Sequence, residues 1–161
     1  MNSRIVVGVS GSMASLGALR WAGQEASRLQ GQLCVVRAWH PEQLAPYADP
    51  SDRLDAVRLR QDAERGLAAA LQQAFGPDRP AGLVSEVAEG MAERILVDRS
   101  SRADLLVLGS TSVPAVIGRS IGPVIRSCLS RAYCPVVVIG AEGLARRHDA
   151  DAAGSILVGT G

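Results

Sequence analysis

The feature that constrains this chain most is residues 103–139, where two short apolar runs enclose a glycine-containing loop and a helix-like segment. The first run covers residues 105–108 and stops at Gly109, and the second covers residues 136–139. Continuous apolar runs of this length between turn signals are typical of strands buried on both faces. Strand, loop, helix and strand in this order form a βαβ unit, so the two strands are predicted to be parallel neighbours. The loop leads to a helix start, where such sheets bind anionic ligands.

The remainder of the chain repeats this alternation of apolar runs and helical patterns. Further strands are predicted at residues 5–9, 33–38 and 83–87, and helices at residues 12–30, 49–75 and 91–101. Gly31, just past the first helix, is expected to take the left-handed conformation that ends many helices. The resulting order predicts an α/β fold: an open, twisted, five-stranded parallel sheet with helices on both faces. A chain of 161 residues that is 47% apolar is long enough for a single domain of this kind, which we place at residues 1–140.

Residues 141–161 are expected to lie outside this domain. They begin with a polar, charged segment over residues 142–153, which is typical of a linker or a mobile tail. They end with residues 155–161 (SILVGTG), which echo residues 4–9 (RIVVGV) in the apolar run and in the placement of glycine. Three interpretations of this strand-like segment remain open: the stump of a second repeat, an added edge strand, or a chance similarity.

The composition argues against nucleic acid and membrane as partners. The formal net charge is +1, all 17 basic residues are arginine, and only five residues are aromatic. A near-neutral chain without a basic cluster offers little attraction to nucleic acid or to an anionic membrane, and few rings are present to stack on bases. No run of about 18 apolar residues and no signal peptide are present, so we expect a cytoplasmic protein.

The candidates for catalysis and metal binding are weak. Cys34, Cys128 and Cys134 have no metal-ligand spacing and lie in or beside apolar stretches, so buried, reduced thiols are expected. Ser10, in the sequence GVSGS, resembles a nucleophile elbow, but the final glycine is displaced and no histidine sits at the expected late position of the domain. The lack of lysine excludes a P-loop. We therefore predict that the protein is not an enzyme and that it has no catalytic residue and no metal site.

Several segments together resemble the universal stress protein family. They are residues 7–12 (VGVSGS), 19–22 (LRWA), 89–90 (EG), 103–110 (ADLLVLGS) and 134–136 (CPV), and the resemblance extends over residues 4–139. It implies a sheet with the strand order 3-2-1-4-5, in the fold of the adenine-nucleotide α-hydrolase-like proteins. It also implies a homodimer. Whether ATP or another adenine nucleotide binds is left open, because some members of the family bind nucleotides and others do not.

The nucleotide-binding members are similar to one another in a loop pattern: Gly, two residues, Gly, nine residues, Gly, and then Ser or Thr. On this chain the three glycine positions are Gly109, Ser112 and Gly122, and the hydroxyl position is Pro123. A further hydroxyl, usual two residues later, is replaced by Ile125. The chain therefore departs from the pattern at three positions of this loop and helix start.

These departures weaken a phosphate site for physical reasons. A phosphate at a helix start is held by free backbone N–H groups and hydroxyls. Pro123 has neither, Ile125 replaces a donor with a hydrocarbon, and Ser112 disfavours the positive φ that a loop around phosphate often needs. Ser10 is a fourth departure, because an acidic residue commonly ends the first strand of nucleotide-binding members, near adenine and ribose. The candidate ligand-binding residues are Val9, Ser10, Ala38, Gly109, Ser110, Ser112, Gly122, Pro123 and Val124.

We therefore expect a regulatory or interaction protein of the universal stress type, with a degenerate nucleotide site and no required cofactor. Its expected partners are an unidentified regulatory protein and a second copy of itself. Residues 136–139 should form the outer strand of the sheet, an apolar edge that self-pairing or residues 156–158 would cover. Two other functions remain open. One is a sensor that binds ATP or AMP through the backbone of Gly109, Ser110, Gly122 and Val124; the N–H groups of Val124 and Ile125 remain for it, and Arg119 and Arg126 could supply charge. The other, ranked last, is a weak hydrolase.

Overall fold

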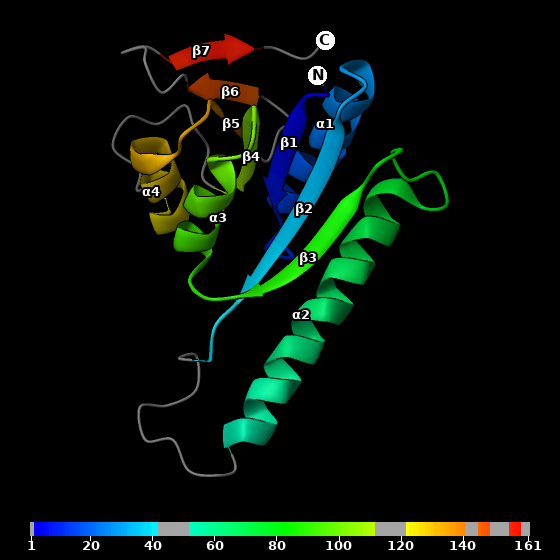
Figure 1. Ribbon diagram of the computed structural model, residues 1–161, viewed down its shortest axis with the longest axis vertical. Coiled ribbons are helices and arrows are strands. Elements are labelled where there is room, and N and C mark those ends of the chain that lie inside the picture. The colour runs from blue at the N-terminus through cyan, green and yellow to red at the C-terminus, as the bar shows by residue number, and fades with distance from the viewer. Residues whose placement is uncertain (1, 42–51, 112–121, 141–144, 149–154, 159–161) are drawn as a thin grey trace.

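The computed structural model describes residues 2–41, 52–111, 122–140, 145–148 and 155–158. Within these ranges, five parallel strands form a sheet with the order β3-β2-β1-β4-β5, which confirms the predicted order (Figure 1). Two antiparallel strands, β6 and β7, extend the sheet beyond β5. The strands are β1 (Arg4–Gly8), β2 (Gln32–Trp39), β3 (Val84–Glu89), β4 (Leu105–Ser110), β5 (Val136–Gly140), β6 (Ala145–His148) and β7 (Ser155–Val158).

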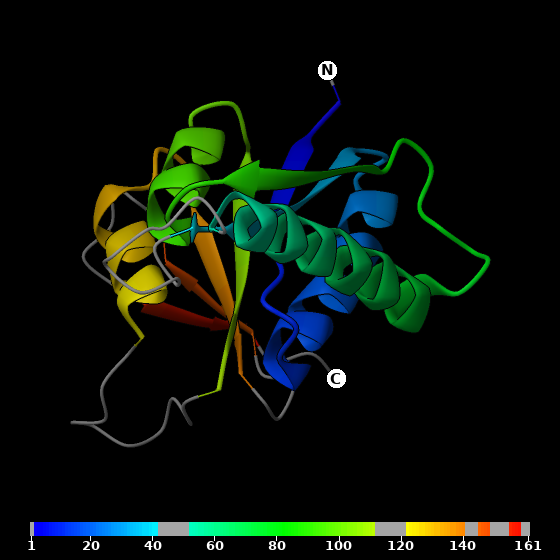
Figure 2. The same ribbon diagram turned by 90° about the horizontal axis from the view of Figure 1, so that it is seen from below.

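Two pairs of helices cover the two faces of the sheet (Figure 2). One pair is α1 (Met13–Arg28) and α2 (Asp52–Phe75), and the other is α3 (Ala92–Ser100) and α4 (Pro123–Arg131). In the central strands, Val7 and Val107 face the first pair, while Val6 and Leu106 face the second. Because both faces are buried, these strands are continuous apolar runs in the sequence. Among the helices of the described ranges, none combines the length and the apolar character that a membrane span requires.

The end of α1 differs from the expectation in one residue. The left-handed conformation falls on Gln30, with φ of 52°, and not on Gly31. Gly31 is needed for a different reason: a Cβ there would collide with the backbone of Ser3, which precedes β1. The backbone oxygen of Ser3 also accepts a hydrogen bond of 2.8 Å from the N–H of Gln32. The glycine therefore lets the start of β2 approach the start of β1.

The expectation that residues 136–139 form the outer strand is wrong. Val136 is opposite His148 and Ile139 is opposite Ala145, so β6 pairs with β5 along its length, and β7 then pairs with β6. A buried strand with an open edge exposes unpaired N–H and C=O groups, and antiparallel pairing satisfies them. The segment expected to be a linker thus contains a strand, and the C-terminal echo of β1 is an added edge strand in this structure.

Candidate ligand-binding cleft

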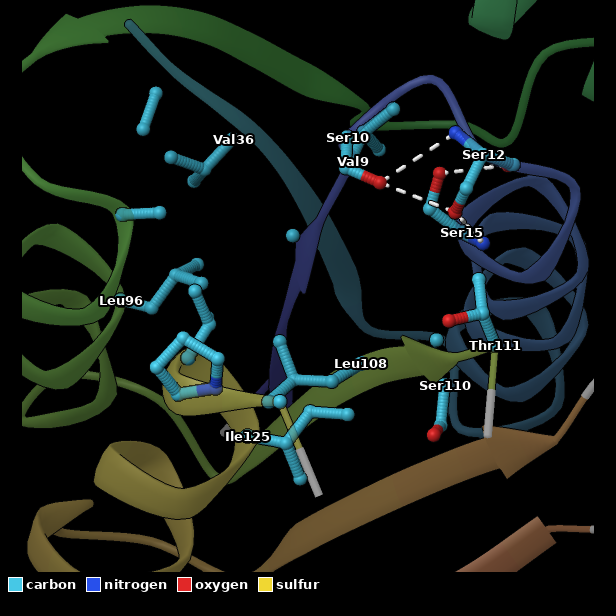
Figure 3. A pocket seen from close by; sticks show the side chains of 17 residues that line it. Val9, Ser10, Ser12, Ser15, Val36, Leu96, Leu108, Ser110, Thr111 and Ile125 are labelled. Carbon is cyan, nitrogen blue, oxygen red and sulfur yellow. Dashed lines mark hydrogen bonds between the residues drawn. The ribbon is translucent and has the colours of Figure 1, made fainter. Parts of the chain in front are cut away.

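A cavity of about 330 Å³ opens at the carboxyl ends of the parallel strands (Figure 3). It lies where the neighbouring strands β1 and β4 lead to helices on opposite faces of the sheet, β1 to α1 and β4 to α4. Such a divergence is the position at which open parallel sheets bind ligands. The described residues that line the cavity come from the ends of β1, β2 and β4 and from α1, α3 and α4.

Eight of the nine candidate residues line this cavity. They are Val9, Ser10, Ala38, Gly109, Ser110, Gly122, Pro123 and Val124. The ninth, Ser112, lies outside the described residues. The sequence brings the eight together because each lies at the carboxyl end of a parallel strand or at the helix start that follows one, and these positions meet at one edge of the sheet.

The sequence analysis did not single out the apolar wall of the cavity. This wall contains Val36, Leu96 and Leu108, whose side chains are at most 4% exposed (Figure 3). Val36 lies two residues before Ala38 on β2, and Leu108 lies two residues before Ser110 on β4, so each shares a face with a residue that was singled out. Period-two spacing from the strand ends would have found both strand residues.

The start of α1 lies across the cavity from this apolar wall and is capped by its own serines (Figure 3). The Ser12 hydroxyl is the N-cap: it accepts a hydrogen bond of 3.1 Å from the N–H of Ser15 and lies 3.1 Å from the Ser10 hydroxyl. The N–H of Ser12 donates to the Ser10 oxygen at 3.4 Å, and the Ser15 hydroxyl donates to the Ser12 carbonyl at 2.9 Å. The Ser10 hydroxyl thus hydrogen-bonds to a serine, and no histidine is among the described residues of the cavity.

The start of α4 has no such side-chain cap. Its N-cap is Gly122, which has no side chain to accept a hydrogen bond, and its first residue is Pro123, which has no N–H. The first hydrogen bond of the helix runs from the N–H of Arg126 to the Gly122 carbonyl at 3.0 Å. In the first turn, therefore, only Val124 and Ile125 carry N–H groups that the helix itself leaves without an acceptor.

The two glycines of the loop pattern have different reasons to be glycine. A Cβ at Gly109 would lie 2.5 Å from the Ser15 nitrogen and closer still to the Ala14 carbonyl, so β4 packs directly on the backbone of α1. A Cβ at Gly122 would meet nothing within 4 Å, and its φ of −56° suits any residue. Gly109 is thus explained by packing alone, while Gly122 leaves open space at the edge of the cavity.

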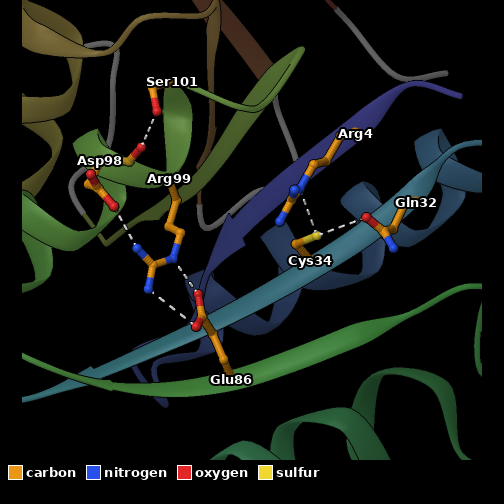
Figure 4. Close-up of polar contacts among 7 residues, drawn as sticks. All are labelled: Arg4, Gln32, Cys34, Glu86, Asp98, Arg99 and Ser101. Atoms are coloured by element: carbon orange, nitrogen blue, oxygen red, sulfur yellow. Dashed lines mark hydrogen bonds and ion pairs between the residues drawn. The ribbon is translucent and has the colours of Figure 1, made fainter. Parts of the chain in front are cut away.

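The wall helix α3 is tied to the sheet by an ion pair (Figure 4). The Arg99 guanidinium donates to the Glu86 carboxylate on β3, with distances of 2.5 Å from Nε and 3.3 Å from the terminal nitrogen. This hydrogen bond to Glu86 raises the pKa of Arg99, and Asp98 accepts a further bond from it at 2.6 Å. The contact fixes the helix that carries Leu96 into the cavity.

The cysteines are buried, free thiols, as the sequence predicts. Burial raises the pKa of the Cys128 thiol to about 12 and that of the Cys134 thiol to about 11. Cys34 accepts a hydrogen bond of 3.2 Å from Nε of Arg4 (Figure 4). In the part of the chain that the structure describes, no group of three or more His, Cys, Asp or Glu residues could hold a metal ion.

Comparison with known proteins shows the family and the fold. The model of the universal stress protein family matches residues 1–140. The chain belongs to the universal stress protein family. Universal stress protein Rv2623 of Mycobacterium tuberculosis is 33% identical over 159 residues, which cover 96% of this chain and 52% of that protein. The chain thus spans about half the length of the curated relatives it matches.

Solved structures of the family share the fold. The universal stress protein UspA from Lactobacillus plantarum has a TM-score of 0.70 and 24% identity, with 84% of this chain and 96% of that chain covered. A universal stress protein family member from Arabidopsis thaliana, solved with AMP bound, has a TM-score of 0.55 and 19% identity, and the match covers 86% of this chain and 91% of that chain. At these identities the likeness establishes the fold, a parallel sheet of order 3-2-1-4-5 with helices on both faces.

Proposed function

We propose that this chain is a non-catalytic regulatory module of the universal stress type whose cleft has lost the phosphate-binding half of a nucleotide site. The observation that carries this proposal is the start of α4. There the N-cap is a glycine without a side chain, the first helical residue is a proline, and the third is Ile125, which is 8% exposed and packs into the core. No hydroxyl group projects from this first turn.

The size of the loss can be estimated from the groups that are missing. Relative to the loop pattern of nucleotide-binding members, Pro123 removes one N–H and one hydroxyl, and Ile125 removes a second hydroxyl. A hydrogen bond to a charged group contributes roughly 1.5–3 kcal/mol. Losing two such bonds weakens binding by roughly a hundredfold or more. The N–H groups of Val124 and Ile125 remain, but they are few donors for a group with several negative charges.

The other half of the cleft suits the uncharged part of a nucleotide better. Val9, Val36 and Ala38 offer small apolar surfaces at the ends of β1 and β2, where a flat ring system can lie. Ser10 stands where an acidic residue commonly contacts adenine and ribose in nucleotide-binding members. The residues thus fit a base and a sugar in part and fit a triphosphate poorly, so no step of the proposed function uses ATP.

A nucleotide sensor is the second candidate. The AMP-bound structure from Arabidopsis thaliana supports it, because that protein shares the fold, and the cleft of this chain lies at the sheet edge where the loop pattern runs. AMP has a single phosphate, for which the two remaining N–H groups of Val124 and Ile125 are a more adequate donor set than for ATP. A hydrolase lacks this kind of support, because the Ser10 hydroxyl hydrogen-bonds to Ser12 and no described residue of the cavity is a histidine or a carboxylate that could act as its base.

Without catalysis, regulation would operate by contact with a partner. Homodimerisation remains part of the proposal, but the pairing of β6 with β5 changes how it could occur. A second copy would have to displace β6 or use another surface. Light scattering at micromolar concentration would decide whether the chain associates with itself. A dimer supports the proposal. A monomer would contradict homodimerisation, and regulation would then require contact with a different protein.

Calorimetric titration with ATP and AMP tests the proposed loss of phosphate binding. We expect ATP to bind more weakly than about 100 μM, which corresponds to a binding free energy of only about −5.5 kcal/mol. Pro123→Ser, which restores an N–H and a hydroxyl, should tighten ATP binding by about tenfold. Pro80→Ser is the matched control: it removes a proline in the connection between α2 and β3, away from the cleft, and should leave ATP binding unchanged. Micromolar ATP binding by the unchanged protein would contradict the proposal.

A further inference from the structure

Helix α3, which lies beside α4, forms a ridge between two grooves of the surface (Figure 1). The groove on the side of β3 has a volume of about 620 Å³, and the groove on the side of α4 has a volume of about 340 Å³. Arg94 and Asp98 line both grooves and are exposed. Because they are four residues apart, they project from the same side of the helix, while Ile95 and Leu96 are buried against the sheet.

The two charges of this ridge are available to another molecule. The Asp98 carboxylate accepts a hydrogen bond of 2.6 Å from Arg99, but its side chain remains 72% exposed (Figure 4). A carboxylate has two oxygens and can accept from a second guanidinium as well. Arg94 forms no ion pair with any residue that the structure describes. The outer side of α3 thus presents one positive and one negative group, one turn apart.

An exposed apolar side chain stands at each end of α3. Met91 is the N-cap of the helix and is 43% exposed. At the other end, the N–H of Tyr133 donates a hydrogen bond of 3.0 Å to the hydroxyl of Ser100, the last residue of α3, and the Tyr133 side chain is 72% exposed. Met91 lines the groove on the side of β3, and Tyr133 lines the groove on the side of α4. Tyrosine and methionine are both enriched at protein interfaces.

We propose that this ridge is an interface between two copies of the chain, in which the two α3 helices pack antiparallel about a two-fold axis. In such a contact Arg94 of each copy meets Asp98 of the other. The same arrangement brings Met91 of each copy to Tyr133 of the other, and a thioether beside an aromatic ring is a favourable contact. The ridge of each copy lies in a groove beside the α3 of the other, which is how helices pack.

A second copy is the occupant that this pattern favours. When α3 is turned end for end, its positive group takes the place of its negative group and Met91 takes the place of Tyr133, so the ridge is complementary to itself. An acidic or a basic segment of another protein would match one of the two charges and repel the other. The edge of β5 is already paired with β6, whereas Arg94 and Asp98 are exposed. This inference rests on the homodimer of the proposed function, because it names the surface of that dimer.

Sedimentation velocity of the full chain between about 1 and 200 μM tests the interface. We expect a dimer with a dissociation constant on the order of 10 μM, because a helix of nine residues offers only a small contact. Arg94→Glu and Asp98→Arg should each weaken the dimer at least about tenfold, because each places like charges opposite one another at two symmetric points. An equal mixture of the two variants should associate about as strongly as the unchanged chain, because both contacts then join opposite charges.

The matched control is a second pair of charges on another helix. Arg58 and Asp62 are also four residues apart, on α2, and their side chains are 76% and 64% exposed. Arg58→Glu and Asp62→Arg change the net charge by the same amounts as the α3 variants. Each should leave self-association unchanged, and mixing the two should not strengthen it, because α2 is outside the proposed interface.

The apolar contact is tested by a pair of methionines. Met91→Ala should weaken the dimer about threefold or more, because it removes the side chain that meets Tyr133. Met13→Ala removes the same side chain from α1, where Met13 is 78% exposed, and should leave the dimer unchanged. Circular dichroism establishes that all variants are folded.

The outcomes separate this interface from the rest of the proposed function. If the unchanged chain is monomeric over the whole range, both the interface and the homodimer are wrong, while the proposed loss of phosphate binding is unaffected. If a dimer forms and Arg94→Glu and Asp98→Arg dimerise as well as the control variants, or if their mixture recovers nothing, the homodimer uses another surface and the α3 interface is wrong. Loss in each variant with recovery in the mixture supports it.

Discussion

Two helix starts flank the cleft, and they are built in opposite ways. Each follows a central parallel strand, β1 for α1 and β4 for α4. At the start of α1, the Ser12 hydroxyl is the N-cap and accepts from the N–H of Ser15, and the N–H of Ser12 donates to the Ser10 hydroxyl. The start of α4 has a glycine N-cap and a proline, with no side-chain cap. The same place in the fold thus has a side-chain cap in one case and none in the other.

The largest expected effect lies where β4 meets the first turn of α1. Gly109→Ala would place a Cβ against the backbone of Ala14 and Ser15, which cannot move aside as a flexible side chain can. We expect a loss of about 3 kcal/mol or more in the free energy of unfolding, measured by urea denaturation. Gly122→Ala, at the other start, meets open space and should change that free energy by no more than about 0.5 kcal/mol. If the two variants were equally stable, the inferred difference in packing between Gly109 and Gly122 would be wrong.

Alkaline pH should loosen α4 before α1. Cys128 lies in α4, and burial raises the pKa of its thiol from 9.0 to about 12, while that of Cys134, just after α4, rises to about 11. Since the folded state keeps these protons longer than the unfolded state, this stability is present below pH 9 and is lost as pH rises towards 11–12. Each thiol lowers the free energy of unfolding by up to about 1.4 kcal/mol per pH unit there. Hydrogen exchange above pH 9 should therefore accelerate in α4 first; faster exchange in α1 would contradict the assignment.

Removing the serine cap of α1 should have a moderate effect. Ser12→Ala deletes the oxygen that accepts from the N–H of Ser15 at 3.1 Å. An N-cap of this kind contributes about 1 kcal/mol, so thermal or urea unfolding should show a loss of that size. Ser130→Ala, on the exposed side of α4, removes a hydroxyl that donates to the carbonyl of Arg126 in the same helix at 2.9 Å, and it is the matched control. An unchanged free energy of unfolding in Ser12→Ala would mean that the Ser12 cap does not stabilise the start of α1.

The smallest expected effect comes from adding a cap where none exists. Gly122→Ser supplies a hydroxyl at an N-cap position whose backbone is already extended, with φ of −56° and ψ of 153°. We expect a gain of a few tenths of a kcal/mol in the free energy of unfolding, because glycine is only slightly worse than serine as an N-cap. A loss of stability would indicate that the start of α4 depends on glycine in a way that its geometry does not suggest.

Much of this molecule follows from local sequence patterns. The order of helices and strands and the buried parallel strands depend on periodicity and on where strands end. The candidate residues of the cleft were chosen from the strand ends and from the loop pattern of the family that the chain resembles, and eight of the nine line the cavity. Leu96, on α3, was not identified as a cleft residue because an apolar helix residue that lines a cavity has the same pattern as one that fills a core. The role of Gly109 also depends on contact with α1, which lies far away in sequence.

Strand β6 marks the limit of this reasoning. Residues 145–148 (ARRH) are polar and charged, and they were interpreted as part of a linker because no local pattern favours a strand there. Their pairing with β5 depends on the open edge of a distant strand, which supplies hydrogen-bond partners whatever the side chains are. The sequence pattern of β5 indicates that its open edge needs a pairing partner, but it does not indicate which segment of the chain pairs with it.

The central claim, that the start of α4 does not hold a triphosphate, is tested most directly at its own amides. In the ¹⁵N-labelled protein, the N–H signals of Val124 and Ile125 would be followed during titration with ATP up to about 1 mM. We predict that they move little and only in fast exchange, with no saturation at one equivalent. Large shifts of these two signals that are complete at one equivalent of ATP would contradict the account.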